Sequence, residues 1–266
     1  MLAALLVLPS LLTGGAEAPA DAVRLIGPRV EYRANEASAT RSPWIDANGW
    51  RILRDPGRTF VYHVKGETAA LAAAEAFTYG AGALISADAP GADAFARMLD
   101  FLKSVPGADL APVADLGVVD DGSDASGELL NLLTRMNLLF KIGRNPDPNL
   151  PVNVRLTGEA QNPGVAAHKI RSQIGDENRS LRIYGSEVVI GRLTRGPRLT
   201  RLFLLNYDAR PVLGMRVRVR GAYSKGDPRV SGVADAHLTD WTQDGVATEF
   251  TVPEIRVLAV IDLTRE

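Results

Sequence analysis

The stretch FVYHVKGETAALAAAEAFTYGAGALIS (Phe60–Ser86) holds two short apolar runs with an alanine-rich segment between them. The runs FVYHV and GALIS are typical of buried strands, and ETAALAAAEAFTYG is typical of a helix that ends at Gly80. A strand, a helix and a second strand in this order predict a βα unit of a mostly parallel sheet.

The same rhythm continues toward the C-terminus. GADAFARMLDFLKSVPG places Phe95, Met98 and Leu102 on one helical face and ends at a proline-glycine breaker. Further strands are expected at APVADLGVVD, FKIG and VNVRLTG, and a further helix at SGELLNLLTRMNLL. About five strands between Phe60 and Thr157 would form a small, doubly wound, flavodoxin-like layer. An eight-fold βα barrel of typical size needs about 250 residues, so this segment is too short to form one.

After residue 180 the apolar residues recur with a period of two. In GMRVRVRG (Gly214–Gly221), Met215, Val217 and Val219 alternate with three arginines. Further strand-like runs follow at spacings near ten residues with turn residues between them, which predicts an antiparallel β-sandwich. We expect the arginines to form a solvated outer face; the alternative is a site for an anionic polymer.

These patterns divide the chain into four parts. They are a signal peptide (1–20), an irregular N-terminal segment (21–58), an α/β domain (59–178) and a β-sandwich domain (179–266). The fold class is therefore α/β plus all-β, with a small parallel sheet preceding the sandwich.

The first twenty residues predict export. An apolar core from Leu2 to Leu12 precedes two A-x-A patterns, and cleavage is expected after Ala20. The mature protein would then be periplasmic or extracellular. The alternative is a short buried N-terminal helix. No other segment approaches the length of a membrane span, so no stable span is expected.

Composition excludes several classes of function. The formal net charge of -1 argues against a nucleic-acid partner, which favours a strongly basic face. The absence of cysteine removes disulfides, thiolate metal sites and cysteine nucleophiles. His63, His168 and His237 show no metal-ligand spacing, and no nucleotide-binding motif is present. We therefore expect neither a metal nor a cofactor.

Three segments carry a resemblance to a known group of proteins: NRSLRIYGSEVVIGRL, RLFLLNYDARPVLGMRVRVRG and TEFTVPEIRVLAVIDL. Over about Arg179–Leu263 the chain resembles the C-terminal β-sandwich of multidomain bacterial glycoside hydrolases. The preceding layer resembles the amidotransferase-like α/β domain that lies between barrel and sandwich in some of those enzymes.

The resemblance implies a secreted, non-catalytic accessory or glycan-binding part of a glycoside hydrolase system. Its partners would be an oligosaccharide or polysaccharide and a catalytic barrel protein. The alternatives are a glycoside hydrolase, acting alone or with a barrel on a separate chain, and a purely structural envelope protein.

The segment SPWIDANGW is the first candidate ligand site. Trp44 and Trp50 bracket Asp46 and Asn48, and sugars bind where flat aromatic faces lie beside amides and carboxylates. The alternative is a turn at DANG whose two tryptophans seal the α/β core.

The loop DDGSDASG is the second candidate. Asp120 and Asp121 follow a predicted strand and precede a helix, a position that suits a hydroxyl-bearing ligand or a cation. The alternative is that Ser123, Asp124 or Ser126 caps the helix. No catalytic pair is assigned, because the sequence does not place Asp46 across a cleft from either acid of this loop.

Overall fold

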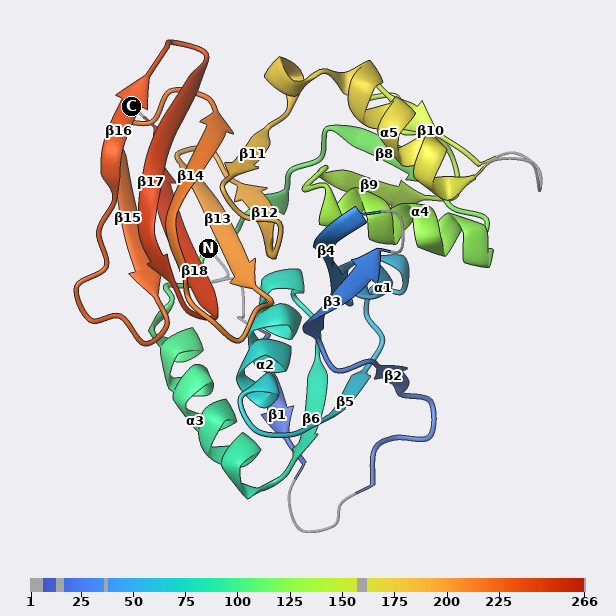
Figure 1. Ribbon diagram of the computed structural model, residues 1–266, viewed down its shortest axis with the longest axis vertical. Helices are drawn as coiled ribbons and strands as arrows, with labels where there is room; N and C mark the ends of the chain where they lie inside the picture. Colours follow the sequence, from blue (N-terminus) through green and yellow to red (C-terminus); the bar gives the residue numbers. More distant parts are fainter. Residues whose placement is uncertain (1–6, 13–16, 36–37, 157–161, 266) are drawn as a thin grey trace.

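The computed structural model (Figure 1) describes residues 7–12, 17–35, 38–156 and 162–265. Its first sheet is parallel, in the order β1-β6-β5-β2. Phe60, Tyr62 and Val64 point from this sheet into a core shared with two helices. The elements concerned are β1 (Ser10–Leu11), β2 (Val23–Leu25), β5 (Phe60–Val64), β6 (Ala83–Ala87), α2 (Thr68–Tyr79) and α3 (Ala89–Ser104).

The ends of these helices follow local chemistry. Gly80 ends α2 in the left-handed conformation at φ 67°, as predicted, because glycine adopts this conformation without a steric penalty. Asp88 begins α3 by accepting a hydrogen bond from the Gly91 backbone N–H. The strand-helix-strand prediction for Phe60–Ser86 is therefore confirmed.

A second, separate parallel sheet has the order β10-β8-β9. It packs with two helices around its own core, which includes Leu116, Leu129 and Leu133. The elements are β8 (Leu116–Val119), α4 (Asp124–Arg135), β9 (Phe140–Gly143), β10 (Asn153–Val154) and α5 (Pro163–Ile174). The last two residues of the predicted strand VNVRLTG lie outside the described residues.

The expected single layer of about five parallel strands is thus wrong. The predicted strand APVADLGVVD is divided: β7 (Ala111–Pro112) pairs with an antiparallel strand, and only β8 enters the second parallel sheet. The pairing of β7 takes the chain away from the first sheet before β8 begins. The coarser expectation of mixed α/β and β-rich architecture holds.

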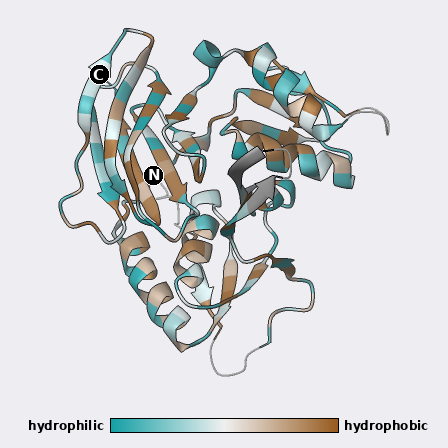
Figure 2. Cartoon of the chain, in the orientation of Figure 1, coloured by the Kyte–Doolittle hydropathy of each residue, from teal (hydrophilic) through white to brown (hydrophobic). Residues whose placement is uncertain are grey.

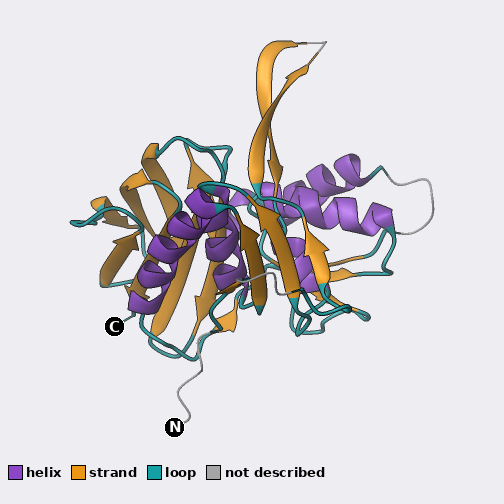
Figure 3. Cartoon of the chain, turned by 90° about the horizontal axis from the view of Figure 1, so that it is seen from below, coloured by secondary structure: helices purple, strands orange, loops and turns teal. Residues whose placement is uncertain are grey.

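The segment expected to be irregular, 21–58, contains regular structure. Besides β2 it forms a hairpin of β3 (Arg29–Asn35) and β4 (Ser38–Asp46), followed by α1 (Gly49–Arg54). Figure 3 shows the hairpin projecting from the rest of the chain. Its base is anchored because Val30 lies opposite Ile45, which is only 1% exposed in the first core. The prediction of irregular structure is therefore wrong.

The C-terminal part contains two antiparallel sheets, in the orders β11-β14-β17-β16 and β15-β18-β13-β12-β7. Residues from both sheets, among them Val217 and Leu204, form one common core. A short 3₁₀ helix (Asp176–Asn178) precedes them. The strands are β11 (Leu181–Tyr184), β12 (Val189–Arg195), β13 (Leu199–Asn206), β14 (Val212–Arg220), β15 (Lys225–Val230), β16 (Thr239–Gln243), β17 (Ala247–Ile255) and β18 (Leu258–Thr264).

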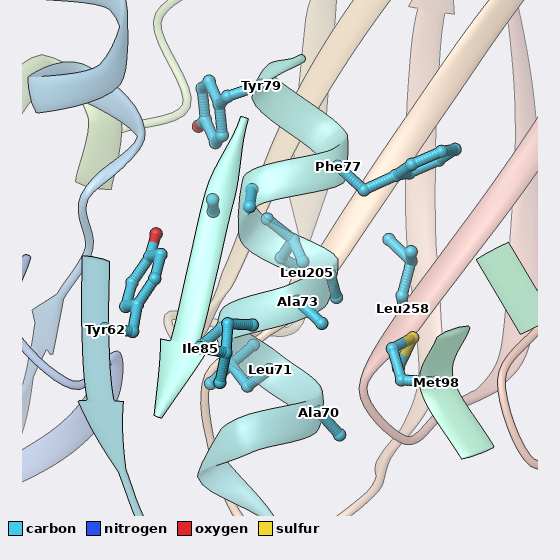
Figure 4. Packing of buried hydrophobic residues seen from close by; sticks show 14 of the residues in the cluster. Tyr62, Ala70, Leu71, Ala73, Phe77, Tyr79, Ile85, Met98, Leu205 and Leu258 are labelled. Carbon is cyan, nitrogen blue, oxygen red and sulfur yellow. The ribbon is translucent and has the colours of Figure 1, made fainter. Parts of the chain in front are cut away.

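The five-stranded sheet is buried on both faces. On β13, Leu202 and Leu204 point into the core between the sheets, whereas Phe203 and Leu205 pack with α2. Figure 4 shows α2 between the parallel strands and the antiparallel strands, and Figure 2 shows the apolar character of this region. Burial on both faces explains why RLFLLNY reads as a continuous apolar run.

The arginines of β14 lie on the side opposite that core. Arg216 pairs with Glu249 at 3.2 Å, and Arg218 lies 3.5 Å from the same carboxylate. Arg216 and Arg220 remain partly or fully exposed, but Arg218 is buried beneath its ion pairs. The stripe is an outer face on which Arg216 and Arg218 pair with neighbouring acids and Arg220 binds the Asn178 carbonyl. No helix in the part of the chain that the structure describes is long and apolar enough to cross a membrane.

Candidate functional site

The base of the hairpin holds the first two predicted ligand contacts. Trp44 and Asp46 lie opposite Glu31 and Arg29 in the strand pair and share one face of it. Arg29 Nε lies 3.1 Å from Asp46 Oδ2. The guanidinium of Arg135 on α4 lies 4.0 Å from the centre of the Trp44 ring. Both predicted residues are half-buried, with an arginine beside each.

Trp50 lies deeper. Its side chain is 8% exposed and belongs to the core of the second parallel sheet. A Cβ added at Gly127 of α4 would lie 3.2 Å from the indole, so the ring packs closely against the backbone of α4. The guanidinium of Arg51 covers the ring at 4.3 Å. Trp50 therefore packs α1 against α4, and a ligand could reach it only if α1 moved.

Asp120 is held by an arginine that the sequence did not point to. Arg54 Nε and Nη2 each donate a hydrogen bond of 2.8 Å to the Asp120 carboxylate. The Arg54 guanidinium holds the pKa of Asp120 at about 2. Arg54 also lies 5.6 Å from the Trp50 ring centre, so it joins two of the predicted residues in one cluster.

Asp121 and Ser123 show how the acidic loop is built. Ser123 is the N-cap of α4 and accepts a hydrogen bond from the Ser126 backbone N–H, so the capping alternative is confirmed. Asp121 is exposed and accepts hydrogen bonds from the Ser123 backbone N–H and hydroxyl. Hydrogen bonds from that hydroxyl and backbone lower the pKa of Asp121.

Asn48 is fully buried and belongs to a network centred on Glu75, which sequence reasoning missed. Glu75 accepts hydrogen bonds from the Asn48 backbone N–H at 2.7 Å and from Asn48 Nδ2 at 2.9 Å. The Tyr62 hydroxyl donates at 2.9 Å and the Tyr207 hydroxyl at 2.6 Å. Burial raises the pKa of Glu75 in spite of these donors. A glutamate within an otherwise apolar, alanine-rich helix was the available signal.

A groove of about 610 Å³ lies beside this network. Its volume falls within the range of roughly 300–1,000 Å³ that is usual for small-molecule sites. α2, α3, the hairpin base and the loops at one end of the antiparallel sheets form its walls. Apolar groups lining it include Leu71, Met98, Phe101 and Val257; charged groups include Arg29, Glu67, Arg97, Asp208 and Arg256.

The groove wall is set by the LLNYD segment, part of the sequence that carried the resemblance. Asn206 Nδ2 donates to the carbonyls of Arg210, Ile255 and Arg256, which fixes the β13–β14 turn. Tyr207 lines the groove and reaches Glu75 behind it. Burial opposes the ionisation of Asp208, but hydrogen bonds from Tyr32 and Arg210 lower its pKa.

The carboxyl groups that line this groove belong to Glu67 and Asp208. The carboxyl groups whose pKa is raised by burial, Glu75 and Asp115, do not line it. Asp115 instead accepts hydrogen bonds from the Ser180 backbone N–H. A general acid in a glycosidase needs a raised pKa. Among the described residues, no cluster of three or more metal-ligating side chains occurs.

Comparison with known proteins identifies a related fold. No protein-family model matches the sequence, and no curated protein matches it. Among solved structures, α-L-fucosidase isoenzyme 2 from Paenibacillus thiaminolyticus superposes with a TM-score of 0.56 at 8% identity. The match covers 79% of this chain and 61% of that chain, so this chain spans less than two thirds of the fucosidase.

A GH42 β-galactosidase from G. stearothermophilus, Gan42B, is a more distant neighbour. Its TM-score is 0.41 at 6% identity, over 91% of this chain and 53% of that chain. A GH30 endoxylanase from Clostridium papyrosolvens C71 has a TM-score of 0.30 at 9% identity, over 80% of this chain and 52% of that chain. The likeness to the fucosidase shows that the chain has a fold related to that of a glycoside hydrolase.

Proposed function

We propose that this protein is an exported, non-catalytic glycan-binding part of a glycoside hydrolase system. The observation that carries the proposal is the fold shared with the fucosidase, together with a groove that places apolar and charged side chains next to one another. Carbohydrate binding requires apolar surface and polar groups side by side, which this groove has; hydrolysis requires two suitably placed carboxyl groups in addition.

The proposed glycan contacts are Trp44, Asp46 and Asp121. Arg29 lines the groove and pairs with Asp46, and Trp44 shares the hairpin face of Asp46. The three proposed contacts are not among the residues that line the groove, so a bound glycan would have to extend beyond it. Asn48, Trp50 and Asp120, also predicted from the sequence, lie behind this surface with their side chains buried. In this proposal those three hold the contact residues in place.

A glycan array with a parallel thermal melt tests the proposal. Trp44→Ala should weaken binding several-fold, since a stacked ring contributes on the order of 1 kcal/mol, and should leave the melting temperature within a few degrees. Trp50→Ala is the matched control, because truncating a buried tryptophan costs about 3–5 kcal/mol of stability. Failure of the wild type to bind any glycan would contradict the proposal.

The second candidate is a hydrolase whose catalytic barrel lies on another chain. It is favoured by the span of the match, which covers 61% of the fucosidase chain. A partner chain encoded beside this one, and hydrolysis only when both chains are mixed, would support it. Hydrolysis by this chain alone would instead make the protein an enzyme in its own right.

Export is proposed from the sequence of the first twenty residues, of which 1–6 and 13–16 lie outside the described residues. Cleavage after Ala20 would remove β1, whose Ser10 and Leu11 pair with Leu84 and Ile85 at one edge of the first sheet. Mass spectrometry of the protein from its native host should find a chain that begins at Asp21. A chain that retains Met1 in the cytoplasm would contradict export.

A further inference from the structure

Arg192 lies on β12 with its guanidinium at the C-terminal end of α2. Its Nη1 donates a hydrogen bond of 2.6 Å to the Thr78 carbonyl. The guanidinium carbon lies 4.8 Å from the centre of the Tyr79 ring. Burial lowers the pKa of Arg192 from its ordinary value, which means that its charge is poorly solvated.

Arg192 is half-buried, whereas the three arginines of the described chain that are fully buried each have a carboxylate partner. Arg179 pairs with Asp176, Arg201 with Asp262, and Arg218 with Glu249. Arg192 has no hydrogen bond or ion pair to a carboxylate within the described ranges. The C-terminus of α2 supplies roughly half a unit of negative charge, which leaves part of the arginine charge uncompensated.

A cavity of about 240 Å³ lies against this side chain. Two of its lining residues are arginines, and no described lining residue is acidic. Arg201 is already engaged: its Nε and Nη2 bind Asp262 and its Nη1 binds the Pro106 carbonyl. Arg192, in contrast, forms one hydrogen bond with the residues that the structure describes, through Nη1. The cavity is lined by Phe77, Thr78, Gly80, Ala108, Leu110, Pro112, Arg192, Thr194, Arg201 and Phe203, and by Val7, which belongs to the segment that cleavage after Ala20 would remove, so the site described is that of the uncleaved chain.

We propose that this cavity binds a small organic carboxylate with an apolar body, whose carboxylate pairs with the free edge of the Arg192 guanidinium. The planar fork of donors on arginine matches a carboxylate in a bidentate arrangement. The site goes beyond the proposed glycan function, and it lies on different residues from the groove.

The residues that line the cavity indicate which kind of anion it would bind. Phe77 and Phe203 meet edge to face at 6.2 Å, and both line the cavity with Leu110 and Pro112. Such walls favour an apolar group and leave the hydroxyls of a sugar or the outer oxygens of a phosphate without partners. The volume is below the roughly 300 Å³ at which drug-sized sites begin, so the ligand is limited to about one ring or a short branched chain.

Thermal unfolding of the full chain in benzoate, acetate and sulfate at matched ionic strength tests the site. Because a ligand that binds only the folded state raises its stability, benzoate at about ten times its Kd should raise the Tm by about 3 °C. Arg192→Met should lose this response. Arg195→Met, on the same strand but bound to Thr200 and Tyr223 outside the cavity, should keep it.

Equilibrium dialysis of the wild type with radiolabelled benzoate provides a readout that needs no variant, and it should give about one site per chain. Arg192→Lys, which keeps the charge but not the fork, should weaken binding several-fold. The proposal is overturned if benzoate neither binds nor raises the Tm, if sulfate is as effective as benzoate, or if Arg192→Met responds like the wild type. Glycan binding would be unaffected by any of these results.

Discussion

Glu75 is the residue on which three segments of the chain converge. Its carboxyl group accepts from Asn48 before α1, from Tyr62 on β5 and from Tyr207 after β13, while its own backbone belongs to α2. A fully buried acid is costly unless its partners satisfy it, and here each partner comes from a different element. The network therefore fixes the antiparallel sheets relative to the first parallel sheet.

Replacing Glu75 by leucine should destabilise the protein by about 3–5 kcal/mol, because buried donors on Asn48 and both tyrosines would lose their acceptor. Urea unfolding monitored by fluorescence measures this. Glu75→Gln is the milder control. Its amide oxygen still accepts a hydrogen bond, and a tyrosine hydroxyl can rotate to accept one from the amide NH₂. A loss below about 1 kcal/mol for the leucine variant would contradict the role assigned to the network.

The wild type and Glu75→Gln should differ in how their free energy of unfolding depends on pH. Burial raises the pKa of Glu75 above its ordinary value of 4.5, so the unfolded chain releases this proton at lower pH than the folded chain. The stabilising contribution is complete below pH 4.5 and is lost as the pH rises through the folded-state pKa. The free energy of unfolding of the wild type should therefore fall relative to that of Glu75→Gln as the pH rises from 4.5 through the folded-state pKa of Glu75. A parallel course for both proteins would contradict the raised pKa.

For single residues, the sequence indicated which side chains matter better than it indicated the side chains that bind them. It singled out Asn48 and Asp120, but Glu75 and Arg54, which hold them, are distant in the chain. Such pairings depend on how α1 packs on α2 and α4. Local patterns do not contain that information, whereas Ser123 as a cap could be predicted because its partner is three residues away.

Among the elements, β13 and β18 form the centre of the antiparallel region. They are joined not only by backbone pairing but by Arg201, which is 3% exposed and forms two hydrogen bonds to Asp262, of 2.6 and 2.9 Å. Arg201 also binds the Pro106 carbonyl after α3. The pair therefore connects the antiparallel sheet to the helical layer.

Arg201→Ala should cost about 3 kcal/mol of stability, since it would leave the buried Asp262 carboxylate with only the more distant Arg229, at 3.6 Å. Arg216→Ala is a matched control on the outer face of β14, where the pair with Glu249 is partly exposed and is expected to contribute about 1 kcal/mol or less. Denaturant unfolding of both variants measures the difference. Equal losses would contradict the assignment of Arg201 as an internal link.

The helices and the strands with clear periodicity were predictable, and their association was not. The helix patterns correspond to α2, α3 and α4, because capping residues and apolar spacing are local. The division of the parallel strands into two sheets follows from β7, whose two residues pair with β12 more than eighty positions later in the chain. The anchoring of the hairpin by Ile45 likewise depends on distant core residues.

For the whole molecule, the arrangement places the groove where three parts of the chain meet. The two helices of the first layer, the base of the hairpin and the LLNYD turn each contribute a wall. The fold likeness to a fucosidase shows a fold related to that of a glycoside hydrolase. The proposed function rests on this fold and on the chemistry of the groove, and the sequence resemblance to an accessory region stays a prediction.

The most direct test is isothermal titration calorimetry of the full chain with the glycan that an array identifies. The glycan is then recovered from the calorimeter cell and its mass is measured. A saturable isotherm with about one site per chain and a glycan of unchanged mass is the predicted result. No heat of binding for any glycan would contradict carbohydrate association, and shortened products would contradict the non-catalytic role.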